Sequence, residues 1–143
     1  MITRRLNVSR YAGEPPAAAD GEPDRAIRGG PLYGKEEVLS LAASGQLRLW
    51  SAGAIRDAQK WTLELEDLCS LLSLAVHRGR YLRSEWCEQK PDGPWAACDA
   101  YRVTRFEWNE AAHKDFELTY YMKFAISKTG QMLLSASNHP EGA

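Results

Sequence analysis

The stretch from Asp115 to Ser127 carries the strictest pattern in the chain, and it limits what the C-terminal half can fold into. Every second position is apolar: Phe116, Leu118, Tyr120, Met122, Phe124 and Ile126. The positions between them carry Glu117, Thr119, Tyr121 and Lys123. Alternation with a period of two indicates a β-strand with one face in the core and the other toward water.

Three further strands are predicted around this one, at Arg80–Glu88, Trp95–Trp108 and Gln131–Ser137. Turn-forming residues separate the four strands, at Lys90–Pro94, Asn109–Glu110 and Lys128–Gly130. Successive strands joined by short turns predict an antiparallel meander of about four strands. We expect its polar face, which carries Tyr121, Lys123 and nearby arginines, to hold the functional groups.

Helical patterns precede the strands. They cover Lys35–Ser44, a short segment that Ser51 caps and that continues through Ala58, and about Leu63–Val76 behind a capping Thr62. The last of these has Leu65, Leu68, Leu72 and Val76 at helical spacing, which predicts a helix lying on the apolar face of the sheet. Helices followed by a run of strands predict an α+β fold, with the helices on one face of an antiparallel sheet.

The first 30 residues differ in composition from the rest. The segment from Gly13 to Asp24 is rich in proline, glycine and acidic residues and has no periodic apolar positions. Such a segment buries too little surface to offset its ordering entropy. We therefore predict a flexible tail over residues 1–30 and a single domain over residues 31–143.

Charge and composition exclude several classes of protein. The formal net charge of −1 argues against a basic, sequence-independent DNA coat, although it allows a local cationic face. No apolar run approaches the roughly 20 residues that span a bilayer, and the N-terminus lacks the apolar core of a signal peptide. We therefore expect a cytoplasmic protein without membrane contact.

The three cysteines and three histidines show no paired ligand spacing, so we expect no metal site. If Asp92-Gly93 is the centre of a two-residue hairpin turn, Cys87 and Cys98 face each other across two strands. The alternative, which we favour, is that they are two ordinary buried thiols.

Four segments between about Lys35 and Asn138 share their order and spacing with a known family. The first is Ser44-Gly-Gln-Leu47, and the second runs from Ala58 to Leu68. The third joins Tyr81-Leu-Arg-Ser84 to Cys98-Asp-Ala-Tyr101, and the fourth joins Tyr121-Met-Lys123 to Leu133-Leu-Ser-Ala-Ser-Asn138. On these segments the chain resembles the MqsR family of bacterial toxins, the mRNA-cleaving members of toxin–antitoxin pairs.

The resemblance implies an α+β fold of the microbial-ribonuclease type, related to the RelE toxins, and a metal-independent endoribonuclease that uses no cofactor. In such enzymes the 2′-hydroxyl of the RNA attacks the adjacent phosphate, which leaves a 2′,3′-cyclic phosphate and a 5′-hydroxyl. The protein must supply a base, an acid, donors to the transition state and a surface that stacks single-stranded bases. The implied partners are single-stranded mRNA and a cognate antitoxin protein.

Transferred residue by residue, the family's strand-one lysine falls on Arg83, its glutamine on Cys98, its sheet tyrosine on Tyr121 and its last-strand lysine on Asn138, beside His139. The tyrosine alone is kept. An arginine holds phosphate well but is a poor proton donor, whereas imidazole titrates near neutral pH. We therefore predict three catalytic residues: Arg83 holds the scissile phosphate, Tyr121 donates to the phosphate or positions the 2′-hydroxyl, and His139 exchanges the proton.

The predicted RNA-binding residues are Lys123, Arg105, Asn138 and Asp99. Lys123 lies on the same strand face as Tyr121. Arg102 and Arg105 point to opposite faces of their strand, so at most one of them can contact the RNA backbone. Asp99 belongs to a matched segment and could instead fix the strand.

Trp86, Trp95 and Trp108 are candidate platforms for stacked bases, with core or edge packing as the commoner use of such residues. Three functions stay open at this point. The first is an active ribonuclease toxin restrained by an antitoxin. The second is a catalytically inactive relative that binds protein or RNA, and the third is a different ribonuclease chemistry with His139 as the main catalytic group.

Overall fold

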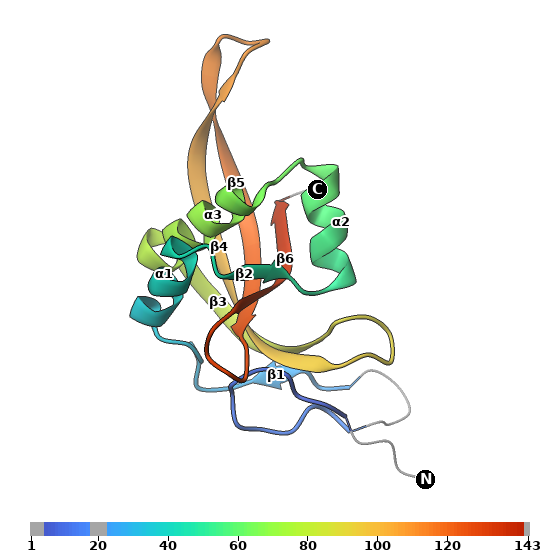
Figure 1. Ribbon diagram of the computed structural model, residues 1–143. Coiled ribbons are helices and arrows are strands. Elements are labelled where there is room, and N and C mark those ends of the chain that lie inside the picture. Colours follow the sequence, from blue (N-terminus) through green and yellow to red (C-terminus); the bar gives the residue numbers. More distant parts are fainter. Residues whose placement is uncertain (1–4, 18–22, 142–143) are drawn as a thin grey trace.

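Figure 1 shows the computed structural model, which describes residues 5–17 and 23–141. The α+β class is confirmed, with three helices and a six-stranded, mostly antiparallel sheet of strand order β1-β3-β4-β5-β6-β2. The strands are β1 (Ala26–Ile27), β2 (Leu47–Leu49), β3 (Arg80–Glu88), β4 (Trp95–Asn109), β5 (Lys114–Ile126) and β6 (Leu133–Pro140). The helices are α1 (Lys35–Ala43), α2 (Ala52–Lys60) and α3 (Leu65–Arg78).

The predicted meander forms the centre of the sheet, but the expected number of about four strands is too low. β1 pairs antiparallel with β3, and β2 pairs parallel with β6. These two edge strands have two and three residues. A strand that short shows no alternation, so its pairing depends on long-range contacts that the sequence pattern does not report.

Helix α3 covers one face of the sheet, which we call the covered face. Leu68 and Leu72 of α3 are buried in one cluster with Met122 and Phe124 of β5 and Tyr101 of β4. The helix begins later than expected, because Glu64 and Asp67 form a reciprocal capping box and Thr62 takes a positive φ of 52°. Helix α1 packs on α3.

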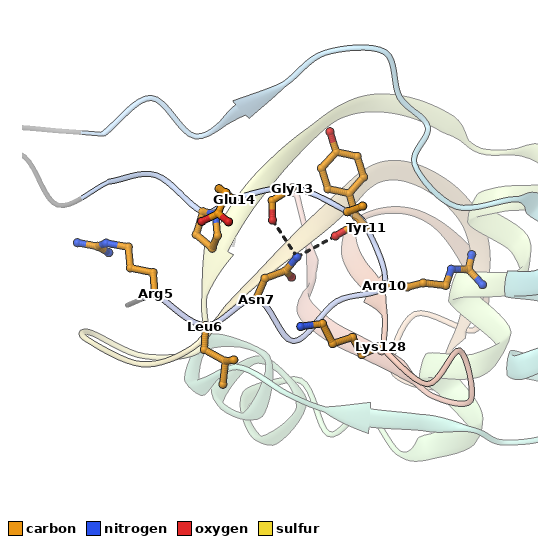
Figure 2. A pocket seen from close by; sticks show the side chains of 10 residues that line it. Arg5, Leu6, Asn7, Arg10, Tyr11, Gly13, Glu14 and Lys128 are labelled. Carbon is orange, nitrogen blue, oxygen red and sulfur yellow. Dashed lines mark hydrogen bonds between the residues drawn. The ribbon is translucent and has the colours of Figure 1, made fainter. Parts of the chain in front are cut away.

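The N-terminal segment packs against the sheet. Val8 N–H donates to the carbonyl of Trp95, Arg10 N–H donates to that of Ile126, and the Ser9 hydroxyl accepts from Ala97 N–H. Asn7 Nδ2 donates to the carbonyls of Tyr11 and Gly13 (Figure 2). These two hydrogen bonds close the loop that runs from Asn7 to Gly13.

Residues 5–17 and 23–30, which belong to the predicted flexible tail, thus have defined contacts with the rest of the chain. The N-terminal segment and β1 cover a second small cluster built on Trp86, Trp95 and Ala97. Burial of these distant tryptophans favours the packing of the segment, and its local composition does not report that contribution. The rest of the predicted tail, residues 1–4 and 18–22, lies outside the described residues.

Helix α2 lies along the second half of β6. The Ser51 hydroxyl donates to the carbonyl of Ala136, and Asp57 Oδ2 accepts from Asn138 N–H. Because β2 pairs with Leu133–Ser135, β2 and α2 together satisfy much of the outer edge of β6. An edge that is covered in this way resists pairing with other chains.

The hairpin of β4 and β5 extends past its neighbours. Pairing of β4 with β3 reaches Arg102, and pairing of β5 with β6 reaches Tyr120. The outer part, residues 103–118, therefore forms a two-stranded arm that projects from the body (Figure 1). Phe106 and Trp108 on this arm are 69% and 55% exposed.

Within the part of the chain that the structure describes, no helix is long and apolar enough to cross a membrane.

Candidate functional site

The face of the sheet opposite α3, which we call the open face, brings together side chains from β3, β4, β5 and β6. Directly paired antiparallel residues point to the same face. One row across the strands is Arg83, Ala100, Lys123 and Ser137, and the next is Arg102, Tyr121 and His139. Glu85 lies two positions after Arg83 and therefore on this face as well.

Tyr121 contacts both of the other predicted catalytic residues there. The Arg83 guanidinium donates to the Tyr121 hydroxyl at 2.8 Å, and the His139 ring stacks on the Tyr121 ring with centroids 5.4 Å apart. Arg83 comes from β3, Tyr121 from β5 and His139 from β6. The sheet register thus gathers three groups that are far apart in the sequence.

The Tyr121 hydroxyl is a neutral donor at neutral pH. Burial raises the pKa of Tyr121, and the positive charges of Lys123 and Arg83 offset only part of that rise. Because the hydroxyl oxygen accepts from Arg83, its own proton can be donated to another group.

His139 also has a defined hydrogen bond. Its Nδ1 lies 3.1 Å from the carbonyl oxygen of Pro140, which can only accept, so Nδ1 carries the proton. Nε2 then either offers a lone pair or, in the imidazolium, donates a proton. The side chain can therefore take or give a proton at Nε2.

Glu85 is a site residue that we did not predict. Its Oε1 lies 3.2 Å from Lys123 Nζ and 3.7 Å from Arg83 Nε, so one carboxylate links two cations. Burial opposes the charged form of Lys123, but the pKa of Lys123 is raised because nearby Cys87 and Glu85 favour the cation. The signal that could have found Glu85 is its position two residues after Arg83 on a strand.

Arg105 lies on the covered face, and the fold does not bring it together with Arg83, Tyr121 and His139. It pairs with Leu118, and its Nε lies 2.8 Å from Glu107, which also accepts from the Tyr120 hydroxyl. Arg102 is the arginine of β4 on the open face, where its Nη2 lies 2.6 Å from Glu141.

Asp99 and Asn138 are buried at 0% exposure, which contradicts their predicted contact with RNA. The Asp99 carboxylate accepts from Leu32 N–H, Tyr33 N–H and the Ser84 hydroxyl. Burial raises its pKa, and these three donors lower it in part. Asp99 therefore fixes the segment before α1 to the sheet.

The side chain of Asn138 contacts helix α2 and an earlier residue of its own strand, β6. Its Oδ1 accepts from the Ser135 hydroxyl, and its Nδ2 donates to the carbonyl of Ala54. The backbone pairs with Met122, a residue of the covered face. Asn138 thus joins α2 to β6, and its neighbour His139 takes the position on the open face.

Cys87 and Cys98 are buried free thiols on diagonal positions, because Cys87 pairs with Ala96 and Cys98 with Glu85. A two-residue turn at Asp92-Gly93 would pair Cys87 directly with Cys98. That prediction is wrong, because Glu88 pairs with Trp95 and the connection between the two strands is longer. The neighbouring Cys98 thiol and the charge of Lys123 lower the pKa of Cys87, and burial offsets part of that change.

Of the candidate stacking platforms, Trp86 and Trp95 are core residues. Trp108 is exposed on the arm. It lies on the same face of β4 as Thr104 and Phe106, which is the open face. It is therefore the tryptophan of the three that can contact a partner.

Two cavities lie near the sheet. One of about 490 Å³ lies between the first turn of α2 and β3, and Glu85 and Lys123 line it. Another of about 560 Å³ lies in the N-terminal loop, with Arg5, Arg10 and Lys128 around it (Figure 2). None of the predicted site residues lines the second cavity, and its Arg10 forms an ion pair with Glu37.

No family model, curated protein or solved structure matches this chain. Its chemistry must therefore be inferred from the groups on the open face. They include the cations of Arg83, Lys123 and Arg102, a neutral hydroxyl donor, a carboxylate and an imidazole, which suit an anionic substrate and proton transfer. Among residues 5–17 and 23–141, no three His, Cys, Asp or Glu side chains are placed to share a metal ion.

Proposed function

We propose that this chain is an endoribonuclease toxin that cleaves single-stranded mRNA and is neutralised by a cognate antitoxin protein. The observation that carries the proposal is the contact of Arg83, Tyr121 and His139 on one open sheet face, with Glu85 beside Arg83. The 2′-hydroxyl oxygen attacks the adjacent phosphorus, and the bond from phosphorus to the 5′-oxygen breaks. The products are a 2′,3′-cyclic phosphate and a 5′-hydroxyl.

Arg83 and Tyr121 bind the scissile phosphate. The guanidinium offers several N–H donors in one plane, and the Tyr121 proton is not used by Arg83. Donors fixed before the reaction stabilise the charge that develops on the phosphate oxygens without reorganising. The contact between the two side chains holds both donors in place.

The reaction needs one group to accept a proton and another to donate one. Glu85 accepts the proton of the attacking 2′-hydroxyl, and His139 Nε2 donates a proton to the leaving 5′-oxygen. Glu85 lies on β3 and His139 on β6, on either side of the contact between Arg83 and Tyr121. A phosphate held by that contact therefore has one proton-transfer group on each side.

The architecture of the sheet also supports the proposal. A mostly antiparallel sheet with helices on one face and an open polar face is compatible with the microbial-ribonuclease architecture that the resemblance to the MqsR family implies. The open face is also the surface that an antitoxin would cover to block cleavage. On this proposal the protein acts on mRNA in the bacterial cytoplasm.

The test is expression of the wild type from a tightly repressed promoter, with growth measured and RNA 5′ ends mapped. Growth arrest with new 5′-hydroxyl ends is expected, and Tyr121→Phe, Arg83→Ala and His139→Ala should each relieve it. Arg105→Ala, which removes an arginine of the covered face, is the matched control and should remain toxic. Healthy growth and intact RNA, with soluble folded wild type, would favour a binding protein without catalysis.

A further inference from the structure

The cavity of about 490 Å³ on the open face is a second place where an anion can bind. Four cationic side chains from separate parts of the chain line it: Arg25, Arg56, Lys90 and Lys123. Two carboxylates, Glu85 and Glu88, also line it, so the lining carries a net charge of +2. The whole chain carries −1, and the positive charge is therefore concentrated here.

Two of the four cations are already paired. Arg25 Nη2 lies 3.3 Å from Glu88, and Lys123 Nζ lies 3.2 Å from Glu85. Arg56 and Lys90 form no ion pair with any residue in 5–17 or 23–141. The Arg56 guanidinium lies close to Gly53 in the first turn of α2: its Nη2 is 4.0 Å from where a Cβ on Gly53 would be. Both residues line the cavity.

The cavity is continuous with the candidate active site. Glu85 and Lys123 line it, and Glu85 also contacts Arg83. Its volume falls in the range of sites that hold whole small ligands, and it therefore exceeds the needs of a phosphate alone. An RNA strand whose scissile phosphate lies at Arg83 would carry a neighbouring nucleotide into it.

We propose that this cavity binds the nucleotide next to the scissile bond, with Arg56 and Lys90 as the ligands of its phosphate. The inference rests on the proposed function, because it adds a second phosphate of the same RNA strand. Arg56 supplies paired N–H donors that match a phosphate, and Lys90 supplies a point charge.

The first experiment compares a dinucleoside monophosphate with the same molecule carrying an additional 5′- or 3′-terminal phosphate. The wild type should cleave one phosphorylated form with a kcat/KM about tenfold higher, as expected for a hydrogen-bonded charged contact. Arg56→Ala should bring that ratio close to one, and Arg56→Lys should restore part of it. Arg78→Ala on α3, which removes an equal charge from the opposite layer, should keep the wild-type ratio.

A second experiment does not depend on cleavage. Binding of a 2′-O-methyl octanucleotide, which cannot be attacked, is followed by fluorescence anisotropy over a series of salt concentrations. The slope of log K against log salt should fall by about 0.7 in Arg56→Ala, the value for one phosphate contact to a single strand. Arg78→Ala should leave the slope unchanged.

These outcomes separate the two proposals. A changed slope in Arg56→Ala, without cleavage by the wild type, would support the phosphate site and overturn the nuclease. Cleavage by the wild type, with the same ratio and slope in Arg56→Ala, would overturn the phosphate site and leave the nuclease standing.

Discussion

On the covered face, the Asp99 carboxylate is buried and accepts hydrogen bonds from Leu32, Tyr33 and Ser84. On the open face, Tyr121 contacts both Arg83 and His139, and all three side chains remain at least partly exposed. Polar groups on the first face satisfy the backbone and so contribute to folding. Those on the second face keep donors that the fold does not use, and these donors can bind a substrate.

The same contrast separates two neighbouring residues of β6. Asn138 is buried and joins Ser135 to α2, while His139 stacks on Tyr121 at the surface. Substitutions on the covered face should therefore change stability, and substitutions on the open face should change activity. The following variants test that division, from the largest expected effect to the smallest.

Asp99→Ala should lower the free energy of unfolding by about 4 kcal/mol, because three donors lose their acceptor in a buried place. Urea unfolding followed by tryptophan fluorescence measures the change. Ser84→Ala, which removes one of the three donors, should cost only about 1 kcal/mol. A loss below 1 kcal/mol in Asp99→Ala would break the comparison.

Glu85→Gln should lower kcat/KM for RNA cleavage about 100-fold, since a general base contributes at least that much. Single-turnover cleavage of a short RNA measures the change. Glu117→Gln, an exposed carboxylate of the arm, is the control and should keep the wild-type kcat/KM. An unchanged kcat/KM in Glu85→Gln would exclude Glu85 as the base.

Asn138→Ala should cost about 2 kcal/mol of stability, because a buried amide with two hydrogen bonds is lost. Cleavage per folded molecule should stay within about threefold of the wild type, since the side chain does not reach the open face. Activity corrected for the folded fraction is the measurement. A loss of corrected cleavage activity as large as that in His139→Ala would show that Asn138 belongs to the candidate active site.

Asp99 should also make stability depend on pH. Its pKa is raised by burial, so the folded state binds its proton more tightly than the unfolded state, where aspartate has a pKa of about 3.9. The stability that this group contributes is full below the unfolded pKa and is lost as pH rises through the folded pKa. The free energy of unfolding of the wild type should therefore exceed that of Asp99→Asn by less as the pH rises, measured by urea titration. A difference that grows with pH would contradict the raised pKa of Asp99.

Trp108→Ala should change the free energy of unfolding by less than about 0.5 kcal/mol, because the side chain is 55% exposed on the arm. Thermal unfolding is sufficient to measure this. Trp95→Ala on the covered face, where the ring is 1% exposed, should by contrast cost about 3–5 kcal/mol. Equal losses in the two variants would show that the arm belongs to the folded core.

The sequence by itself determined the three helices, the four long strands and the faces of these elements. Period-two alternation located β5, and with it the shared face of Tyr121 and Lys123. Helical spacing located α3 and its apolar stripe. These patterns are local, because backbone geometry fixes which side a residue points to within a few positions of it.

The tertiary structure alone decided which polar side chains form hydrogen bonds inside the fold and which remain available to a substrate. Asp99 meets Leu32 and Tyr33 across more than 60 positions of the chain, and Asn138 meets Ala54 across more than 80. Strand register likewise places Glu85 beside Lys123, and distant tryptophans order the N-terminal segment. Hydrogen bonds and burial between distant segments leave no periodic signal in the sequence, so the pairing of strands had to be seen before the site could be assigned.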